Sequence, residues 1–283
     1  MPTLTRPEGT EAGDLHLSRR AAIGSLFFTG YALAALSAEA APISTPADGL
    51  VIEEALIPNG AAQPLPAYVA RPKGGGRHAC IIVVNEIFGV HDYIKDVCRR
   101  LAKLGYVAVA PEFFYRSGVN LPALTDFAEI RKVVSQASVD QVDGDVRAAS
   151  TWLKAQKFAR GERIGITGFC WGGAVVWRAA MVDPDIRAGV AWYGQLKPVI
   201  PRAAELKAPV LGLYGGKDQG IPVADVEAMQ AALKAAGKTG SSIQLYPEAP
   251  HGFHADYRAS FTETAATDGW ARLLAHFKAN GVV

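Results

Sequence analysis

Two kinds of apolar pattern alternate along the chain from about residue 50 to its end. Short apolar runs rich in β-branched residues predict strands, and longer stretches with apolar side chains at every third or fourth position predict helices. The predicted strands are residues 51–57, 67–71, 80–84, 107–110, 163–167, 188–192, 210–214 and 243–246. The predicted helices are residues 93–104, 122–135, 139–156, 173–181, 223–236 and 267–279.

The central strands of this pattern are apolar at successive positions, as in residues 81–84, which read Ile-Ile-Val-Val. Such runs are typical of strands that helices cover on both faces, and their alternation with helices predicts a mostly parallel sheet. The first two strands follow each other without a helix, so we expect them to pair antiparallel at one edge. With no internal repeat and no break in composition, residues 42–283 are expected to form a single α/β domain.

The first 41 residues have the features of an export signal. Ser18-Arg19-Arg20 precede an apolar run, residues 21–36, and small residues follow it, with cleavage expected near Ala40. The paired arginines resemble a twin-arginine signal. We therefore expect export to the periplasm and no stable membrane association after cleavage. The alternatives are an uncleaved membrane anchor and a cytoplasmic protein with a chance apolar segment.

Composition narrows the class of partner. The 283 residues carry a formal net charge of +2, and the 20% that are charged form no long run of one sign. No nucleic-acid partner is expected, because binding one would require a clustered basic face. The sequence has no phosphate-binding G-x-x-x-x-G-K-[ST] motif and no cluster of His, Cys and carboxylates at metal-ligand spacing. We therefore expect a small-molecule substrate, no metal and no cofactor.

The chain contains three cysteines, Cys80, Cys98 and Cys170. A disulfide framework would need an even and denser set in a small chain, so these cysteines do not indicate one. Cys80 falls in a predicted strand and Cys98 in a predicted helix, where cysteine serves as a small apolar side chain. Pairing of Cys80 with Cys98 outside the cytoplasm is the alternative.

The strongest chemical signal is the run Gly-Phe-Cys-Trp-Gly-Gly at residues 168–173, between a predicted strand and a predicted helix. It matches the G-x-S-x-G nucleophile elbow with cysteine in place of serine. The sharp turn strains the backbone at the nucleophile, and the flanking glycines remove the clashes that side chains would make. Cys170 would lie at a helix N-terminus, whose dipole favours a thiolate. The Trp171 backbone N–H would face a developing oxyanion.

Two residues follow later strands as an acid and a base should. Asp218 comes after the strand at 210–214, and His251 comes after the strand at 243–246. Nucleophile, acid and then histidine is the chain order of an α/β-hydrolase, which the sequence resembles. Asp218 would orient the imidazole and stabilise its charged form, and His251 would move the proton. His91 and His254 are weaker candidates for contact with substrate.

With the run Glu-Ile-Phe-Gly at residues 86–89 added to these motifs, the chain from about residue 51 to its end resembles the dienelactone hydrolase family. The resemblance implies that Glu86 accepts the thiol proton of Cys170 when substrate binds. It also implies that the Ile87 backbone N–H is the second oxyanion donor. A carboxylate at the carboxyl end of a central strand would lie where parallel sheets bind ligands, and burial would suit it to accept a proton.

The substrate-binding residues are less well defined. The family carries an arginine four residues after the catalytic histidine, but Ala255 stands at that position and the nearest arginine is Arg258. A second family arginine is expected between the fourth strand and the long helix, where Arg116 and Arg131 are candidates. Tyr193 and Phe253 are candidates for an aromatic pocket wall.

The expected function is cysteine-dependent hydrolysis of a lactone or ester, similar to that of carboxymethylenebutenolidase. A general carboxylesterase acting on other esters is the runner-up within the same class. A non-enzymatic binding protein on a hydrolase scaffold is the alternative from a different class, because a fold does not dictate a function. The sequence leaves the natural substrate and the oligomeric state open.

Overall fold

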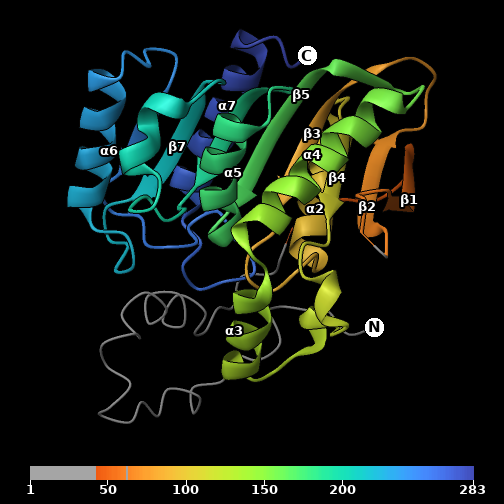
Figure 1. Cartoon of the computed structure of the whole chain (residues 1–283), viewed down its shortest axis with the longest axis horizontal. Coiled ribbons are helices and arrows are strands. Elements are labelled where there is room, and N and C mark those ends of the chain that lie inside the picture. The colour runs from red at the N-terminus through yellow and green to blue at the C-terminus, as the bar shows by residue number, and fades with distance from the viewer. Residues whose placement is uncertain (1–42, 62) are drawn as a thin grey trace.

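The computed structural model describes residues 43–61 and 63–283. Within them, eight strands form one sheet in the order β1-β2-β4-β3-β5-β6-β7-β8 (Figure 1). The strands are β1 (Leu50–Ile57), β2 (Leu65–Pro72), β3 (His78–Val84), β4 (Val107–Pro111), β5 (Ala159–Phe169), β6 (Ile186–Trp192), β7 (Val210–Gly215) and β8 (Ser242–Tyr246). The α-helices are α2 (Asp92–Lys103), α3 (Phe127–Gln136), α4 (Val139–Ala155), α5 (Trp171–Val182), α6 (Val223–Ala235) and α7 (Glu263–Ala279). Three short 3₁₀ helices are η1 (Tyr115–Ser117), η2 (Leu121–Ala123) and η3 (Ile200–Glu205).

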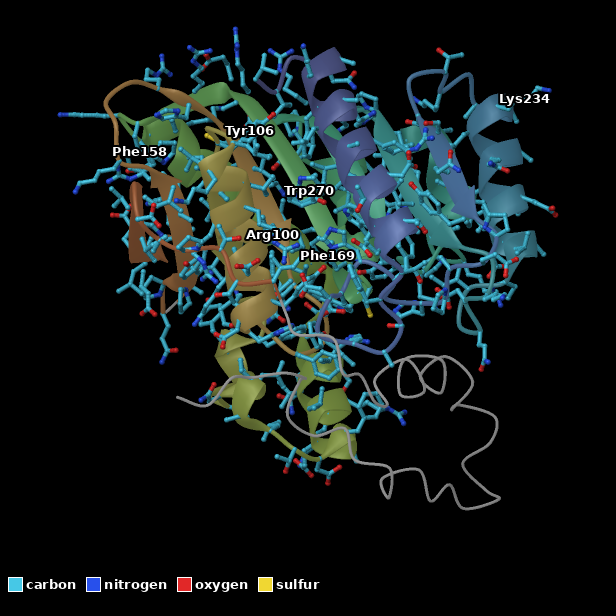
Figure 2. The ribbon with its side chains drawn as sticks, turned by 180° about the vertical axis from the view of Figure 1, so that it is seen from behind. Arg100, Tyr106, Phe158, Phe169, Lys234 and Trp270 are labelled. Carbon is cyan, nitrogen blue, oxygen red and sulfur yellow. The ribbon has the colours of Figure 1, made fainter. Side chains whose placement is uncertain are left out.

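Helices cover both faces of the sheet. Figure 1 shows α4, α5 and α6 in front of it, and Figure 2, seen from behind, shows α2 and α7 across the other face. Strands β3 to β8 run parallel, and β2 is antiparallel to both of its neighbours, β1 and β4. The predicted α/β class, the mostly parallel sheet and the antiparallel first pair are therefore confirmed.

The central strands are buried because helices cover them on both sides. Residues 81–84 of β3 are fully buried, as the continuous apolar run predicts. The candidate catalytic residues follow the carboxyl ends of the strands. In a parallel sheet the carboxyl ends of the strands lie along one edge, and this edge is where α/β proteins bind ligands.

One predicted helix, residues 122–135, begins too early. The structure has a 3₁₀ turn at η2, and α3 starts only at Phe127. Asp126 is the N-cap of α3, since its carboxylate accepts a hydrogen bond from the Ala128 backbone N–H at 2.7 Å. A capping carboxylate satisfies the unpaired N–H groups of the first turn, so it fixes the helix start at that point.

Helix α3 lies outside the two helical layers, beyond the carboxyl edge of the sheet (Figure 1). It packs on a second apolar cluster that is separate from the main core. The buried members of this second cluster are Ile87, Phe88, Phe114, Leu121, Ile130, Val133 and Val134. Trp171, the first residue of α5, packs against the same cluster.

The predicted export signal, residues 1–41, lies outside the described residues, so export and cleavage stay predictions. Among the residues that the structure describes, no helix is both long and apolar enough to cross a bilayer.

Candidate functional site

Cys170 stands at the turn between β5 and α5, as the elbow motif predicts. Its backbone has φ 57° and ψ −115°, a region that residues with a side chain rarely adopt. Two hydrogen bonds fix the turn: the Cys170 N–H donates to the Trp192 carbonyl, and the Gly173 N–H donates to the Cys170 carbonyl, each at 3.0 Å. The Cys170 side chain is buried at the N-terminus of α5.

Glycine is required on both sides of this turn. A Cβ atom at Gly168 would lie 2.4 Å from the Gly172 carbonyl oxygen, and one at Gly172 would lie 2.5 Å from that of Asn85. Contacts this short with backbone atoms cannot be relieved by a change of rotamer. The close approach of Gly172 also brings the loop after β3, with Glu86 and Ile87, against the elbow.

Asp218 and His251 form a buried pair at the same edge of the sheet. Nδ1 of His251 lies 2.7 Å from Oδ2 of Asp218. The other carboxylate oxygen of Asp218 accepts the backbone N–H groups of Gly220 and Ile221, at 2.8 and 3.1 Å. Burial disfavours the charged imidazole, but the Asp218 carboxylate and then Cys170, which also hydrogen-bonds His251, outweigh burial and raise the pKa of His251 to about 10.

We expect Asp218→Asn to lower the pKa of His251, because the carboxylate that favours the imidazolium is gone. A folded-state pKa above the ordinary 6.5 stabilises the fold fully below pH 6.5, and this contribution is lost as pH rises toward 10. The variant should therefore be less stable than wild type by about 1–3 kcal/mol at pH 6, with the gap closing toward pH 10. Urea titrations at both pH values measure the gap, and a pH-independent gap would contradict the pairing.

Glu86 follows β3 and is fully buried among polar side chains. The Tyr257 hydroxyl donates to its Oε2 at 2.6 Å, and the Arg258 guanidinium donates to its Oε1 at 3.0 Å. His91 Nε2 lies 3.3 Å from Oε2. Arg258 also donates to the Tyr257 hydroxyl at 2.9 Å, so the two residues are linked to each other as well as to the Glu86 carboxylate.

The charge state of Glu86 depends on these partners. Burial alone would raise the pKa of Glu86, but the Arg258 charge and the hydrogen bonds from His91 and Tyr257 lower it to about 2. In return, Glu86 outweighs burial of the Arg258 guanidinium and raises its pKa. The pair is therefore ionised at neutral pH.

The other sequence candidates lie in different surroundings. Arg116 is held by Asp145 through two hydrogen bonds, at 2.6 and 2.8 Å, and its described contacts do not include the residues at the elbow. A role of Arg116 in binding substrate therefore stays a prediction. Phe253 packs within the aromatic core, 5.9 Å from the ring of Trp192. The Tyr193 ring lies 5.0 Å from that of His251, and its backbone φ of 38° is strained.

The two weaker histidine candidates have different roles. His254 is buried between aromatic rings and accepts or donates a hydrogen bond with the Tyr93 hydroxyl at 2.6 Å. Burial lowers the pKa of His254 to about 3, so it stays neutral and serves as a core residue. His91 contacts Glu86. Neither this contact nor that of Tyr257 with Glu86 could be predicted from the sequence, since neither has a signal at fixed spacing along the chain.

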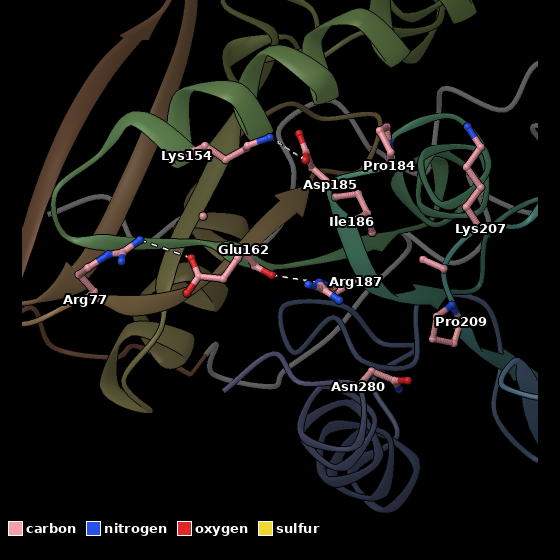
Figure 3. Close-up of a pocket in the computed structure, with 12 residues that line it drawn as sticks. Arg77, Lys154, Glu162, Pro184, Asp185, Ile186, Arg187, Lys207, Pro209 and Asn280 are labelled. Atoms are coloured by element: carbon pink, nitrogen blue, oxygen red, sulfur yellow. Dashed lines mark hydrogen bonds and ion pairs between the residues drawn. The ribbon is translucent and has the colours of Figure 1, made fainter.

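Cavities on the described surface include one on each side of the sheet's strand ends. One, of about 720 Å³, lies at the amino ends of β5, β6 and β7, opposite the edge that carries Cys170 (Figure 3). Its charged side chains are largely paired, as in Arg77 with Glu162 and Lys154 with Asp185. The other, of about 810 Å³, is lined in part by His91, whose Nε2 lies 3.3 Å from the Glu86 carboxylate. Within residues 43–61 and 63–283, no cluster of His, Cys and carboxylates is suited to a metal ion.

Comparison with known proteins identifies the family of this chain. Residues 65–281 match the model of the Dienelactone hydrolase family. Two proteins that carry the name "Putative carboxymethylenebutenolidase" are similar. The one from Methylorubrum extorquens is 49% identical, with 96% of each chain covered, and the one from Escherichia coli K12 is 42% identical, over 89% of this chain and 96% of its own. A crystal structure titled "Putative Dienelactone Hydrolase", from Klebsiella pneumoniae, superposes with a TM-score of 0.76 at 43% identity, covering 82% of this chain and 99% of its own.

Proposed function

The chain belongs to the dienelactone hydrolase family and is a hydrolase, and we propose that it cleaves a lactone or ester with Cys170 as the nucleophile. The observation that carries the proposal is the strained elbow. Cys170 stands at φ 57° at the start of α5, with the buried His251–Asp218 pair beside it and Glu86 in the adjoining loop. This combination supplies a nucleophile, a proton shuttle with its orienting acid, and a second carboxylate.

In the first half of the proposed reaction, the thiol proton of Cys170 passes to Glu86 and the sulfur attacks the carbonyl carbon. The negative charge that develops on the carbonyl oxygen is held by the backbone N–H groups of Ile87 and Trp171. The tetrahedral intermediate collapses when the carbon–oxygen bond to the leaving group breaks. The imidazolium of His251, favoured by its raised pKa, gives the leaving oxygen its proton.

In the second half, the neutral imidazole of His251 takes a proton from water, and the hydroxide attacks the thioester. The carbon–sulfur bond breaks, the acid product leaves, and the sulfur of Cys170 recovers its proton from Glu86. Each proton donor and acceptor returns to its starting state. No group outside the chain is needed for the proton balance.

Glu86 can act as this base only if its pairing with Arg258 changes, because a carboxylate with a pKa of about 2 is a weak proton acceptor. A substrate that carries its own carboxylate would compete with Glu86 for the Arg258 guanidinium. Release from that cation would leave burial as the dominant influence and raise the pKa of Glu86. The proposed substrate is therefore an anionic lactone or ester, with Arg258 as the group that binds the anion in place of the missing arginine at Ala255.

We expect wild type to hydrolyse dienelactone with a kcat/KM at least about tenfold above that for the methyl ester of the same lactone. The two substrates differ only in the free carboxylate, and an added charge-assisted hydrogen bond contributes about 1.5–3 kcal/mol. Stopped-flow absorbance at several substrate concentrations measures both constants.

Para-nitrophenyl acetate serves as the reference ester in the same assay. Hydrolysis of this ester alone would favour the general carboxylesterase, with the Ala255 departure as its cause. Hydrolysis of none of the three would favour a binding protein on a hydrolase scaffold. Equal rates for the free acid and its methyl ester would exclude Arg258 as the anion-binding group.

A further inference from the structure

One irregular segment carries groups from both halves of the site. Residues 250–261, here called the site loop, lie in the connection between β8 and α7. His251, near its start, pairs with Asp218, and Tyr257 and Arg258, farther along, hold Glu86. Backbone hydrogen bonds within the loop are few, such as that of the Arg258 N–H to the Ala255 carbonyl at 3.0 Å, so contacts with neighbouring elements also set the relative position of its two functional ends.

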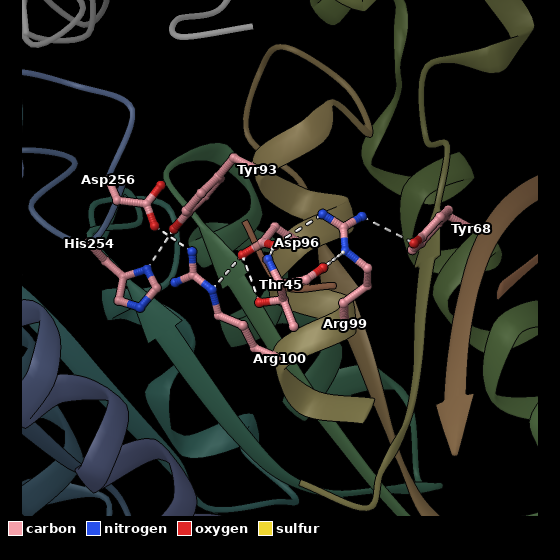
Figure 4. Close-up of polar contacts among 8 residues, drawn as sticks. All are labelled: Thr45, Tyr68, Tyr93, Asp96, Arg99, Arg100, His254 and Asp256. Atoms are coloured by element: carbon pink, nitrogen blue, oxygen red, sulfur yellow. Dashed lines mark hydrogen bonds and ion pairs between the residues drawn. The ribbon is translucent and has the colours of Figure 1, made fainter. Parts of the chain in front are cut away.

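Helix α2 supplies those contacts from the neighbouring layer. The Arg100 guanidinium binds the Asp256 carboxylate on the site loop, and it also binds Asp96 one turn earlier in α2 at 2.6 Å (Figure 4). The Tyr93 hydroxyl, on the same helix, bonds His254 at 2.6 Å. The two contacts lie between His251 and the Tyr257–Arg258 pair in the chain, so they fix the middle of the site loop.

The anchor on α2 is itself held in place. Asp96 accepts the Thr45 backbone N–H at 2.5 Å and pairs with Arg99 at 3.0 Å, as Figure 4 shows. The Ile43 backbone N–H also hydrogen-bonds Asp256. Asp96 and Asp256 are almost fully buried, with side chains 3% exposed, and Arg100 is 16% exposed. A shielded and multiply bonded ion pair of this kind restricts its partners far more than an exposed one does.

We propose that Arg100 and Asp256 are positioning residues for the reaction. Their ion pair fixes the site loop, so that Tyr257 and Arg258 stay on Glu86 while His251 stays on Asp218. Asp256 directly precedes Tyr257 and Arg258 in the chain, so a shift of residue 256 displaces two of the three side-chain partners of Glu86. The inference rests on the proposed function and adds residues that the triad and its family motif do not include.

The test compares Arg100→Gln with Arg178→Gln. Arg178 forms an ion pair of similar burial with Asp143, 13% and 7% exposed at 3.2 Å, but its described contacts do not include the site loop. Arg100→Gln is expected to lower kcat/KM for dienelactone hydrolysis by about 10- to 100-fold, the effect of a misplacement near 1 Å. Arg178→Gln is expected to leave it within about threefold.

The pH profile separates positioning from stability alone. If Arg258 moves off Glu86, burial is opposed less strongly and the pKa of Glu86 rises, so the acid limb of kcat/KM shifts to higher pH. The charged and titratable groups around Glu86 are Arg258, Tyr257, His91, Tyr93, Tyr193 and His254. Of these, Tyr257, Arg258 and His254 lie on the site loop.

Two further variants test the positioning role of the Arg100–Asp256 pair. Asp256→Asn retains the shape of the side chain and should reproduce the loss and the shift, and Arg100→Lys should recover part of the rate. Rates are measured well below the unfolding temperature of each variant, with near-ultraviolet circular dichroism to verify the fold. An unshifted profile with wild-type kcat/KM in folded Arg100→Gln and Asp256→Asn would overturn the inference. Failure of the proposed function would instead be seen in Cys170→Ala, whatever Arg100 does.

Discussion

Replacing Cys170 by alanine is expected to lower kcat for ester hydrolysis by about 10⁴- to 10⁶-fold, as loss of the nucleophile does in enzymes with a triad. The alanine side chain fits the elbow, because the backbone keeps the same strained φ and the substitution only removes an atom. The fold should therefore persist, and the loss should appear in kcat. Single-turnover kinetics with dienelactone, an anionic substrate of the proposed kind, measure the loss.

Cys170→Ser tests whether the chemistry depends on sulfur. A serine hydroxyl is a far weaker acid than a thiol, and a carboxylate such as Glu86 does not deprotonate it. We expect a loss of more than about 10³-fold, in contrast with enzymes in which histidine activates serine. Mass spectrometry of quenched wild type should show an acyl group on the peptide that contains Cys170. Near wild-type activity in Cys170→Ala would exclude the proposed nucleophile.

Replacing Arg258 by methionine is expected to destabilise the fold by about 3–5 kcal/mol at pH 7, because Glu86 is left as an unpaired buried charge. Arg258 and Glu86 side chains are 1% and 0% exposed, so water cannot replace the lost partner. In wild type the depressed pKa of about 2 stabilises the fold above pH 4.5, and that contribution is lost as pH falls toward 2. In the variant the pKa of Glu86 rises, so its disadvantage should shrink as the solution is acidified.

The double variant Glu86→Gln with Arg258→Met is the matched control. Because it removes both charges, we expect it to recover most of the lost stability at pH 7. It should remain inactive if Glu86 accepts the thiol proton. Urea titrations of the three proteins at pH 7 and pH 4 provide the comparison, and a loss below about 1 kcal/mol in Arg258→Met would show that the pair is unimportant for stability.

Most of the fold could be predicted from the sequence, because the strands at its centre are read directly from continuous apolar runs. The predicted strand at residues 80–84 lies within β3, and that at 210–214 lies within β7. The helix predicted from residue 122 failed for a local reason. Its apolar spacing continues through η2, whereas the carboxylate of Asp126 ends the turn and starts α3 anew.

Only part of the candidate site could be predicted from the sequence. The elbow is a local motif, and Asp218 and His251 follow it in the chain order of an α/β-hydrolase, so all three can be recognised in the sequence. The partners of Glu86 cannot be recognised in this way, since Tyr257 and Arg258 lie more than 170 residues away in the chain and contact it only in the folded protein. Asp256 and Arg100 have no motif at all, and ion pairs between a helix and a loop leave no periodic signal.

The second apolar cluster has a consequence for how this enzyme could diversify. Its members on α3 and around η2 pack with the residue that follows Glu86 and against the first residue of α5. Their fully buried side chains differ from those of the main core, and Phe127, Ala137 and Trp171 pack against both clusters. Substitutions at Ile130 or Val133 could therefore reshape the wall above the reacting atoms while the sheet keeps its stability. Libraries that vary α3 while conserving the volume of its buried side chains should yield altered substrate ranges at a small loss of stability, whereas the glycines of the elbow should tolerate almost no change.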